Sequence, residues 1–353
     1  MGASYPIGQA STTIFSTACA TVANYINATG PSEVVLGPST TQLFRNLSQA
    51  LWTHIQPGDE IVISNLDHEA NIASWVQLAT HRSAKIIWWS SPSPTNPILT
   101  PSTLLPLLSP RTKLVTCTHT SNILGTINPI AAIASTVHTI PNALFCVDAV
   151  AYAPHRGIDV KALGVDFYSF SWYKVYGPHI ASLYASSAAQ RKLETLGHFF
   201  KPRDSLENLL GLAAANYELT ASLPEVVGYL KEVDWQRIAE YEEFLQGILL
   251  EYLNGKEGIT VRGEPSADKE KRVPVVSFTV EGWRSRDVVE AIERRSDFGC
   301  RWGSFYSNRL CEDVLGLDAV DGVVRVSLVH YNTGGYFPSR SEWRSECYGE
   351  GWE

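Results

Sequence analysis

The chain has 353 residues, of which 44% are hydrophobic and 18% charged, and its formal net charge is −8 at pH 7. This length suits two domains, and the acidic balance argues against nucleic acid or an anionic membrane as the main partner. No apolar stretch is long enough for a transmembrane helix. The first residues lack the regions of a secretory signal, so we expect a cytoplasmic protein.

The six cysteines are scattered along the chain, and none forms a Cys-x-x-Cys pair. This spacing predicts neither a metal site nor a disulfide scaffold. Cys117 and Cys146 lie inside apolar runs, where buried and inert thiols are expected.

Short apolar runs alternate with helical patterns along the first half of the chain. Strands are expected at 33–37, 60–64, 84–90, 112–119, 143–148, 166–171 and 180–186, and helices at 39–55, 71–80 and 129–140. Such alternation predicts an α/β fold, with a mostly parallel sheet and helices on both faces. In sheets of this kind, ligands bind at the carboxyl ends of the strands.

The second half has a different pattern. After a helix expected at 207–221, we expect an amphipathic helix at 235–253, a strand at 272–282, a helix at 285–295 and a strand at 322–332. These elements predict a smaller C-terminal α+β domain. We therefore divide the chain into a large domain, residues 1–225, and a small domain, residues 226–353.

Two polar residues follow neighbouring apolar runs. Lys174 comes directly after the 166–171 strand, where burial would make its amine nucleophilic, although a surface lysine is the simpler interpretation. Asp148 ends the 143–148 strand, and its carboxylate could keep a pyridine nitrogen protonated or simply begin a turn. The short connection between them allows both side chains to face one ring.

Four further residues suggest a bound cofactor. Thr40 and Thr41 begin a helix directly after a strand, which suits a phosphate group but also an ordinary helix cap. His68 follows the 60–64 strand and could stack on an aromatic ring or serve the structure alone. Asn122, past the 112–119 strand, could bond a phenolic oxygen or cap a turn.

Taken together, four segments resemble the class V aminotransferase superfamily, in its cysteine desulfurase-like branch. These segments are LDHEANIASW, THTSNILGTINPI, VDAVAYAPHRGIDVKALGVDFYSFSWYKVYGPH and GVVRVSLVHYNT. The resemblance covers most of residues 33–333, and it also includes fungal secondary-metabolism enzymes related to the loline-pathway cyclase. It implies fold type I, pyridoxal 5′-phosphate (PLP) as cofactor and a homodimer.

The same resemblance assigns individual roles. Lys174 matches the Schiff-base lysine, Asp148 the partner of the pyridine nitrogen, His68 the ring-stacking histidine and Asn122 the residue near the phenolic oxygen. Thr40, Thr41, Ser171 and Tyr173 match phosphate contacts. Arg325 matches the arginine that binds the substrate carboxylate, a role for which a forked guanidinium is suited, although a salt bridge to Asp321 is the structural alternative.

The chain departs from the desulfurase pattern at the catalytic thiol. Desulfurases carry an R-x-G-x-x-C motif, whereas here Tyr306 ends the run Arg301-Trp-Gly-Ser-Phe-Tyr306 and is a candidate substrate contact. Tyr173 and Ala151 also replace usual family residues. Both ends of the chain, and the loop around 201–208, are expected to be short relative to the family.

The sequence thus predicts an enzyme that acts on an amino acid through a Cα carbanion, with Lys174 moving the proton. Because Tyr306 replaces the thiol, we expect elimination, replacement or cyclisation rather than sulfur abstraction. Two alternatives stay open: a cysteine desulfurase or selenocysteine lyase that needs no loop thiol, and a PLP-binding homologue that has lost catalysis.

Overall fold

The computed structural model describes residues 2–213 and 215–333, which form two compact units. Unit 1 contains the residues up to 90, 99–119 and 128–234, and unit 2 contains 91–98, 120–127 and the residues from 235 onward. The predicted domain boundary between residues 225 and 226 falls inside α10 (Leu223–Glu232) and stays a prediction. Cys347 and the expected short C-terminal end lie outside the described residues.

Unit 1 is built on a seven-stranded sheet with the order β1-β7-β6-β5-β4-β2-β3. Its strands are β1 (Val34–Gly37), β2 (Glu60–Ser64), β3 (Lys85–Trp89), β4 (Thr112–Thr118), β5 (Leu144–Asp148), β6 (Phe167–Ser171) and β7 (Ala181–Ala185). The five strands from β6 to β3 run parallel, and β7 is antiparallel to both of its neighbours. The predicted α/β fold with a mostly parallel sheet is confirmed.

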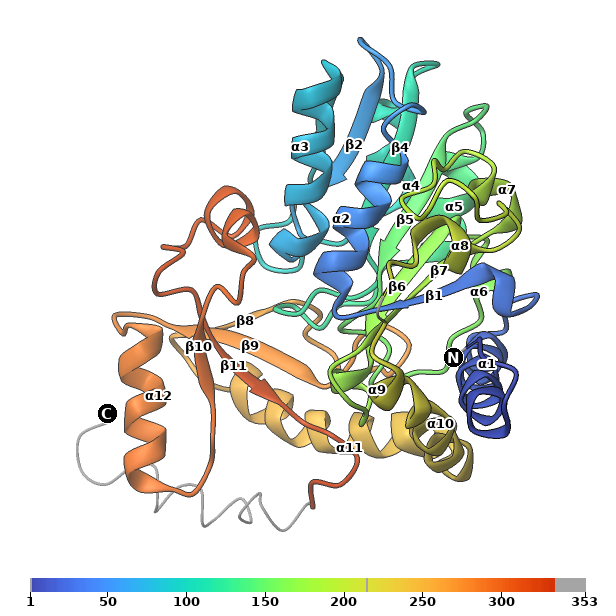
Figure 1. Ribbon diagram of the computed structural model, residues 1–353. Helices are drawn as coiled ribbons and strands as arrows, with labels where there is room; N and C mark the ends of the chain where they lie inside the picture. The colour runs from blue at the N-terminus through green and yellow to red at the C-terminus, as the bar shows by residue number, and fades with distance from the viewer. Residues whose placement is uncertain (1, 214, 334–353) are drawn as a thin grey trace. The chain divides into compact units, whose positions relative to one another are not determined.

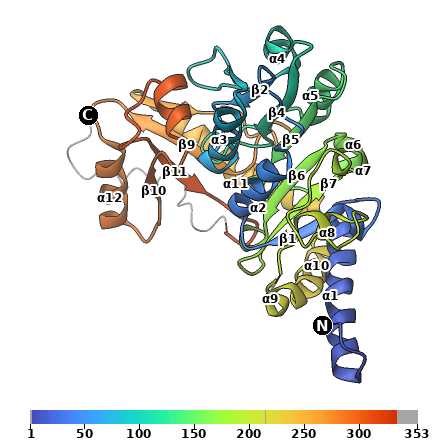
Figure 2. The same cartoon turned by 45° about the horizontal axis from the view of Figure 1, so that its top comes forward.

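The helices of unit 1 begin with α1 (Pro6–Tyr25), which the sequence did not predict and whose first turns extend beyond the other elements of the unit (Figure 2). The others are α2 (Thr40–Ala50), α3 (Ala73–Arg82), α4 (Pro101–Leu104), α5 (Ile130–Val137), α6 (Val160–Leu163), α7 (Ser187–Gln190), α8 (Leu206–Leu210), α9 (Tyr217–Ala221) and α10. The single helix expected at 207–221 is therefore wrong. Gly211 follows α8, and a Cβ there would lie 2.4 Å from the Glu207 carbonyl oxygen.

The core of unit 1 fixes the position of the strand ends. Ser39 caps α2 by accepting a hydrogen bond from the Gln42 amide, as its type predicts. Phe44 on α2 packs against Trp75 on α3, and both side chains are fully buried together with the apolar side chains of β2. A close-packed layer of this kind holds the residues at the ends of the central strands in one arrangement.

Unit 2 has a four-stranded antiparallel sheet with the order β10-β11-β9-β8. Its strands are β8 (Ile259–Arg262), β9 (Val275–Val280), β10 (Arg301–Gly303) and β11 (Val323–Ser327). Helices α11 (Trp235–Asn254) and α12 (Ser285–Arg295) share one apolar cluster with β9 and β11 (Figure 1). The described residues contain no helix that is long and apolar enough to cross a membrane.

The segment 120–127 belongs to unit 2, although it follows a strand of unit 1. Gly125 has a φ of 69°, and a Cβ there would lie 2.3 Å from the Val275 carbonyl oxygen. Only glycine allows this approach without strain. The Gly125 carbonyl in turn accepts a hydrogen bond from the Val273 amide. Residues 120–127 are thus held firmly against the chain just before β9.

Candidate functional site

Asp148 and Lys174 follow the adjacent strands β5 and β6, as the sequence predicts. Asp148 is the last residue of β5 and is 4% exposed, and Lys174 ends a short 3-10 turn, Trp172–Lys174, directly after β6. Lys174 is exposed, which agrees with the simpler interpretation of a surface lysine rather than with a buried amine. Trp172, in the same turn, is fully buried.

Two carboxyl groups meet near the end of β5. Burial raises the pKa of Asp148 to about 6, while a hydrogen bond from the Val150 amide and the charge of Lys174 oppose this rise. Asp67 is fully buried, and burial together with the Asp148 charge raises its pKa to about 8. Asp67 accepts hydrogen bonds from the Thr118 amide and the Asn71 side chain. Asp67 therefore holds the proton of the pair near neutral pH, and Asp148 is the charged member.

His68 is held as a neutral imidazole. Its Nδ1 accepts a hydrogen bond of 3.1 Å from the Ala70 amide, which places its ring proton on Nε2. Burial and the nearby Lys174 charge lower its pKa to about 4. A neutral, fixed ring of this kind is suited to stacking on another flat ring without repelling a positive charge.

A cluster of hydroxyl groups lies where α2 begins. Thr40 Oγ1 and Ser171 Oγ are 2.9 Å apart, and the Thr40 amide also donates to Ser171. Ser169 donates a further bond to Thr40 Oγ1, whereas Thr41 is exposed. Hydroxyls at a helix N-terminus, where the helix dipole favours negative charge, suit an anionic group such as phosphate.

Tyr173 lies beside Lys174 and is 42% exposed. Its ring stacks on His179, with centroids 5.0 Å apart and an interplanar angle of 9°. The Lys174 Nζ lies 5.9 Å from the centre of the Tyr173 ring. This stacking fixes the direction of the tyrosine hydroxyl next to the lysine.

In unit 2, Asn122 and Arg325 share one constellation. The Arg325 Nη1 donates to the Asn122 carbonyl at 3.0 Å, and the Asn122 amide group donates to the Phe305 carbonyl at 3.0 Å. Ser307 donates to Asn122 Oδ1 at 3.0 Å. Both polar atoms of the Asn122 side chain are thus used by the loop that carries Phe305 and Tyr306.

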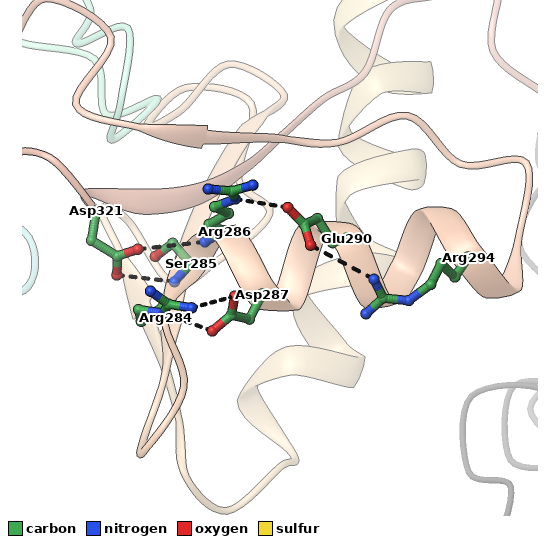
Figure 3. A network of polar contacts seen from close by, with 7 residues as sticks. All are labelled: Arg284, Ser285, Arg286, Asp287, Glu290, Arg294 and Asp321. Atoms are coloured by element: carbon green, nitrogen blue, oxygen red, sulfur yellow. Dashed lines mark hydrogen bonds and ion pairs between the residues drawn. The ribbon is translucent and has the colours of Figure 1, made fainter.

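Arg325 has no carboxylate partner among the described residues. Asp321, the structural alternative, instead accepts hydrogen bonds from the backbone amides of Ser285 and Arg286, where α12 begins (Figure 3). Burial, with a smaller effect from Arg301, lowers the pKa of Arg325 to about 10. A largely buried guanidinium without a counter-ion is suited to binding an anion.

Tyr306 stands on the same loop with a φ of 62° and is 75% exposed. The two cysteines nearest to it in the sequence are poor nucleophiles, because burial raises the pKa of both Cys300 and Cys311 to about 11. The loop therefore carries an exposed phenol and no reactive thiol among its described residues.

Sequence analysis missed several residues of these constellations, among them Asp67, Phe305 and Ser307. Asp67 precedes His68 directly, so an acidic residue next to a candidate ring-stacking histidine was a usable signal. Phe305 and Ser307 gave no such signal, because their contacts with Asn122 join segments more than 180 residues apart.

Comparison with known proteins gives a consistent match. The family model described as aminotransferase class-V matches residues 3–335. The chain is 57% identical to the aminotransferase-like protein FGM3 of Gibberella zeae, over 94% of this chain and 83% of that protein. It is 46% identical to the cysteine desulfurase-like protein ustD of Aspergillus flavus, over 88% of this chain and 72% of that protein. The apo cysteine desulfurase of Thermococcus onnurineus NA1 has the same fold, with a TM-score of 0.83, 24% identity and coverage of 95% and 83%.

Proposed function

Because the chain belongs to the aminotransferase class-V family, whose members are PLP-dependent enzymes, we propose that it carries out elimination, replacement or cyclisation on an amino acid. The observation that carries this proposal is the set of groups around the ends of β5 and β6. There, one buried carboxylate, one neutral imidazole, one amine and a hydroxyl cluster occur together in unit 1.

These groups fit PLP chemically. Asp148 is a buried carboxylate whose charge is destabilised by burial, so it gains from facing a protonated pyridine nitrogen. His68 offers a flat neutral ring for stacking. Thr40, Thr41, Ser171 and Tyr173 offer hydroxyls for the phosphate, and Lys174 offers the amine that binds the cofactor covalently.

When bound, PLP withdraws electrons from the Cα atom of an attached amino acid. The chain supplies the remaining steps. Lys174 would remove or return the proton at the substrate Cα. Arg325 would bind the substrate carboxylate and Tyr306 would contact the substrate, while Asn122, whose side chain is bonded to the loop with Phe305 and Ser307, would orient Arg325 through its backbone carbonyl.

Two observations favour reactions at the substrate carbons over sulfur abstraction. Tyr306 stands at the thiol position of the desulfurase motif. Cys300 and Cys311 hold their protons at neutral pH, since burial raises both of their pKa values to about 11. Persulfide formation requires a thiolate, which neither cysteine provides.

A desulfurase activity is the second candidate, because relatives such as ustD are named cysteine desulfurase-like. The two candidate functions differ in whether sulfide is released from free cysteine. We expect the protein to release little sulfide from free cysteine. Release that Cys300→Ala or Cys311→Ala abolishes would establish the second candidate instead.

The test of the cofactor site is covalent trapping. Purified protein loaded with PLP should be yellow, and borohydride should attach the cofactor to Lys174, as peptide mass spectrometry would show. Lys174→Ala should carry no label. Lys161→Ala, which removes an exposed lysine of α6, is the matched control and should be labelled normally. Label on another lysine, or no bound PLP, would overturn the assignment.

The test of the reaction is exchange of the Cα hydrogen. Amino acids incubated with the PLP-loaded protein in D2O should lose their Cα proton signal in NMR, and Lys174→Ala should prevent this loss. A loaded protein that exchanges no member of a full amino-acid panel would support the alternative of a PLP-binding homologue without catalysis.

We also propose that the protein is a cytoplasmic homodimer. Ile7 on α1 is 77% exposed, and the adjacent Phe199 and Phe200 are 93% and 71% exposed, so a second subunit could cover these side chains. Sedimentation should show a dimer, and a stable monomer loaded with PLP would contradict the proposal.

A further inference from the structure

Two arginines of unit 2 lie directly opposite each other on neighbouring strands. The antiparallel pairing of β10 with β11 places Arg301 in register with Arg325. Like charges at directly opposite positions of a sheet destabilise it. Guanidinium groups cannot relieve this repulsion by losing a proton near neutral pH. The pair therefore needs a further explanation.

An aromatic ring lies against both guanidinium groups. The centre of the Phe305 ring is 3.7 Å from the Arg325 Cζ and 5.6 Å from the Arg301 Cζ. Attraction between a cation and an aromatic ring offsets part of the repulsion. Phe305 has a φ of 50°, and its carbonyl is held by Asn122, which also accepts from Arg325. The loop and the guanidinium are thus fixed by the same residue.

Other arginines of unit 2 do have acidic partners. On α12, Arg284 pairs with Asp287, and Arg286 and Arg294 both pair with Glu290 (Figure 3). In contrast, neither Arg301 nor Arg325 forms an ion pair within residues 2–213 and 215–333, and the Arg325 Nε is buried without a hydrogen-bond partner. Hydrogen-bond donors of Arg301 and Arg325 therefore remain available for a ligand.

We propose that Arg301 and Arg325 together bind a dicarboxylate, so that the substrate is an amino acid whose side chain carries a second carboxylate. Arg325, which Asn122 and Phe305 hold in place, binds one carboxylate. Arg301, which is exposed at the neighbouring position, binds the other. That the ligand is an amino acid rests on the proposed function, whereas the preference for two carboxylates rests on the arginine pair alone.

Succinate and butyrate provide a matched test, since both have four carbons and neither has an amine that could react. Calorimetric titration of the PLP-loaded full chain should show succinate binding at least about tenfold more tightly than butyrate, the scale of one charge-assisted hydrogen bond. Equal affinities in the wild-type protein would overturn the proposal.

Substitutions assign the preference to its residues. Arg301→Gln should weaken succinate binding about tenfold and leave butyrate unchanged, whereas Arg325→Gln should weaken both. Arg284→Gln, which removes an exposed and paired arginine of the same unit, should change neither. A drop for both ligands in Arg301→Gln would contradict the proposal. If the Arg301→Gln variant does not fold, Arg301→Lys, which keeps the charge, replaces it in the same titrations.

Failure of this inference is separable from failure of the proposed function. If borohydride labels Lys174 but succinate is not preferred, only the dicarboxylate site is wrong. If succinate is preferred in an Arg301-dependent way but Lys174 takes no label, the anion site stands and the PLP assignment fails.

Discussion

Each unit brings together two ionisable groups of the same type, and the two pairs differ in how repulsion within them can be relieved. In unit 1, Asp67 takes a proton at neutral pH, so Asp148 can carry the charge alone. In unit 2, two guanidinium groups face each other. Among the described residues, the Phe305 ring and the hydrogen bond from Arg325 to the Asn122 carbonyl offset part of their repulsion. Acids near one another adapt by titration, whereas arginines require a partner.

The largest effect should come from changing the arginine pair. Arg325→Lys keeps the charge but loses the fork, so amino-acid binding should weaken by about 1.5–3 kcal/mol, roughly 10- to 100-fold. PLP binding should hardly change. The measurement is a spectral titration of the loaded protein with amino acids. Normal binding, or loss of PLP together with amino acids, would make Arg325 a structural residue.

Asp148→Asn tests the other pair. It removes the charge that faces the proposed pyridine nitrogen, so PLP affinity should fall by about 1–2 kcal/mol, roughly tenfold. Succinate binding in the unit 2 site should stay as in the wild type. Equilibrium dialysis with PLP gives the affinity, and unaltered affinity would remove Asp148 from the cofactor site.

The acid pair also predicts how stability depends on pH without PLP. Since the folded pKa values of Asp148 and Asp67 are raised to about 6 and about 8, the folded state holds more protons than the unfolded state above about pH 4. The contribution of the pair should therefore fall as pH rises from about 4 to 8. Asp67→Asn should flatten this dependence in thermal unfolding, and an unchanged slope would show that Asp67 does not hold the proton.

The smallest effect should come from α12, where Glu290 pairs with both Arg286 and Arg294. Glu290→Ala removes two exposed ion pairs and should cost less than about 1 kcal/mol in urea unfolding. PLP and succinate binding should both stay unchanged. A larger loss of stability would mean that the exposed ion pairs of α12 contribute more to folding than their exposure implies.

Sequence alone predicts the parts of this molecule that depend on local pattern. The strand at 60–64 matches β2 residue for residue, and β5 ends at Asp148 as expected, because buried strands of a parallel sheet are continuous apolar runs. Helix α1 was missed because its Ser- and Thr-rich run carries weak helix signals.

The arginine pair lies beyond such prediction. Strand β10 has three residues, two of which are exposed, so no apolar pattern marks it. The opposition of Arg301 to Arg325 depends on the register with β11, which the sequence does not state.

The placement of residues 120–127 has a consequence for the order of biosynthesis. Asn122 and Gly125 leave the ribosome long before the residues that they contact, Phe305 and Val275, have been made. Unit 2 therefore cannot close on the nascent chain until most of the polypeptide has emerged. Contacts so distant in sequence make folding slow. Arg325, the proposed carboxylate-binding residue, is consequently among the last groups to reach its folded position, and a chain cut off before β11 lacks it entirely.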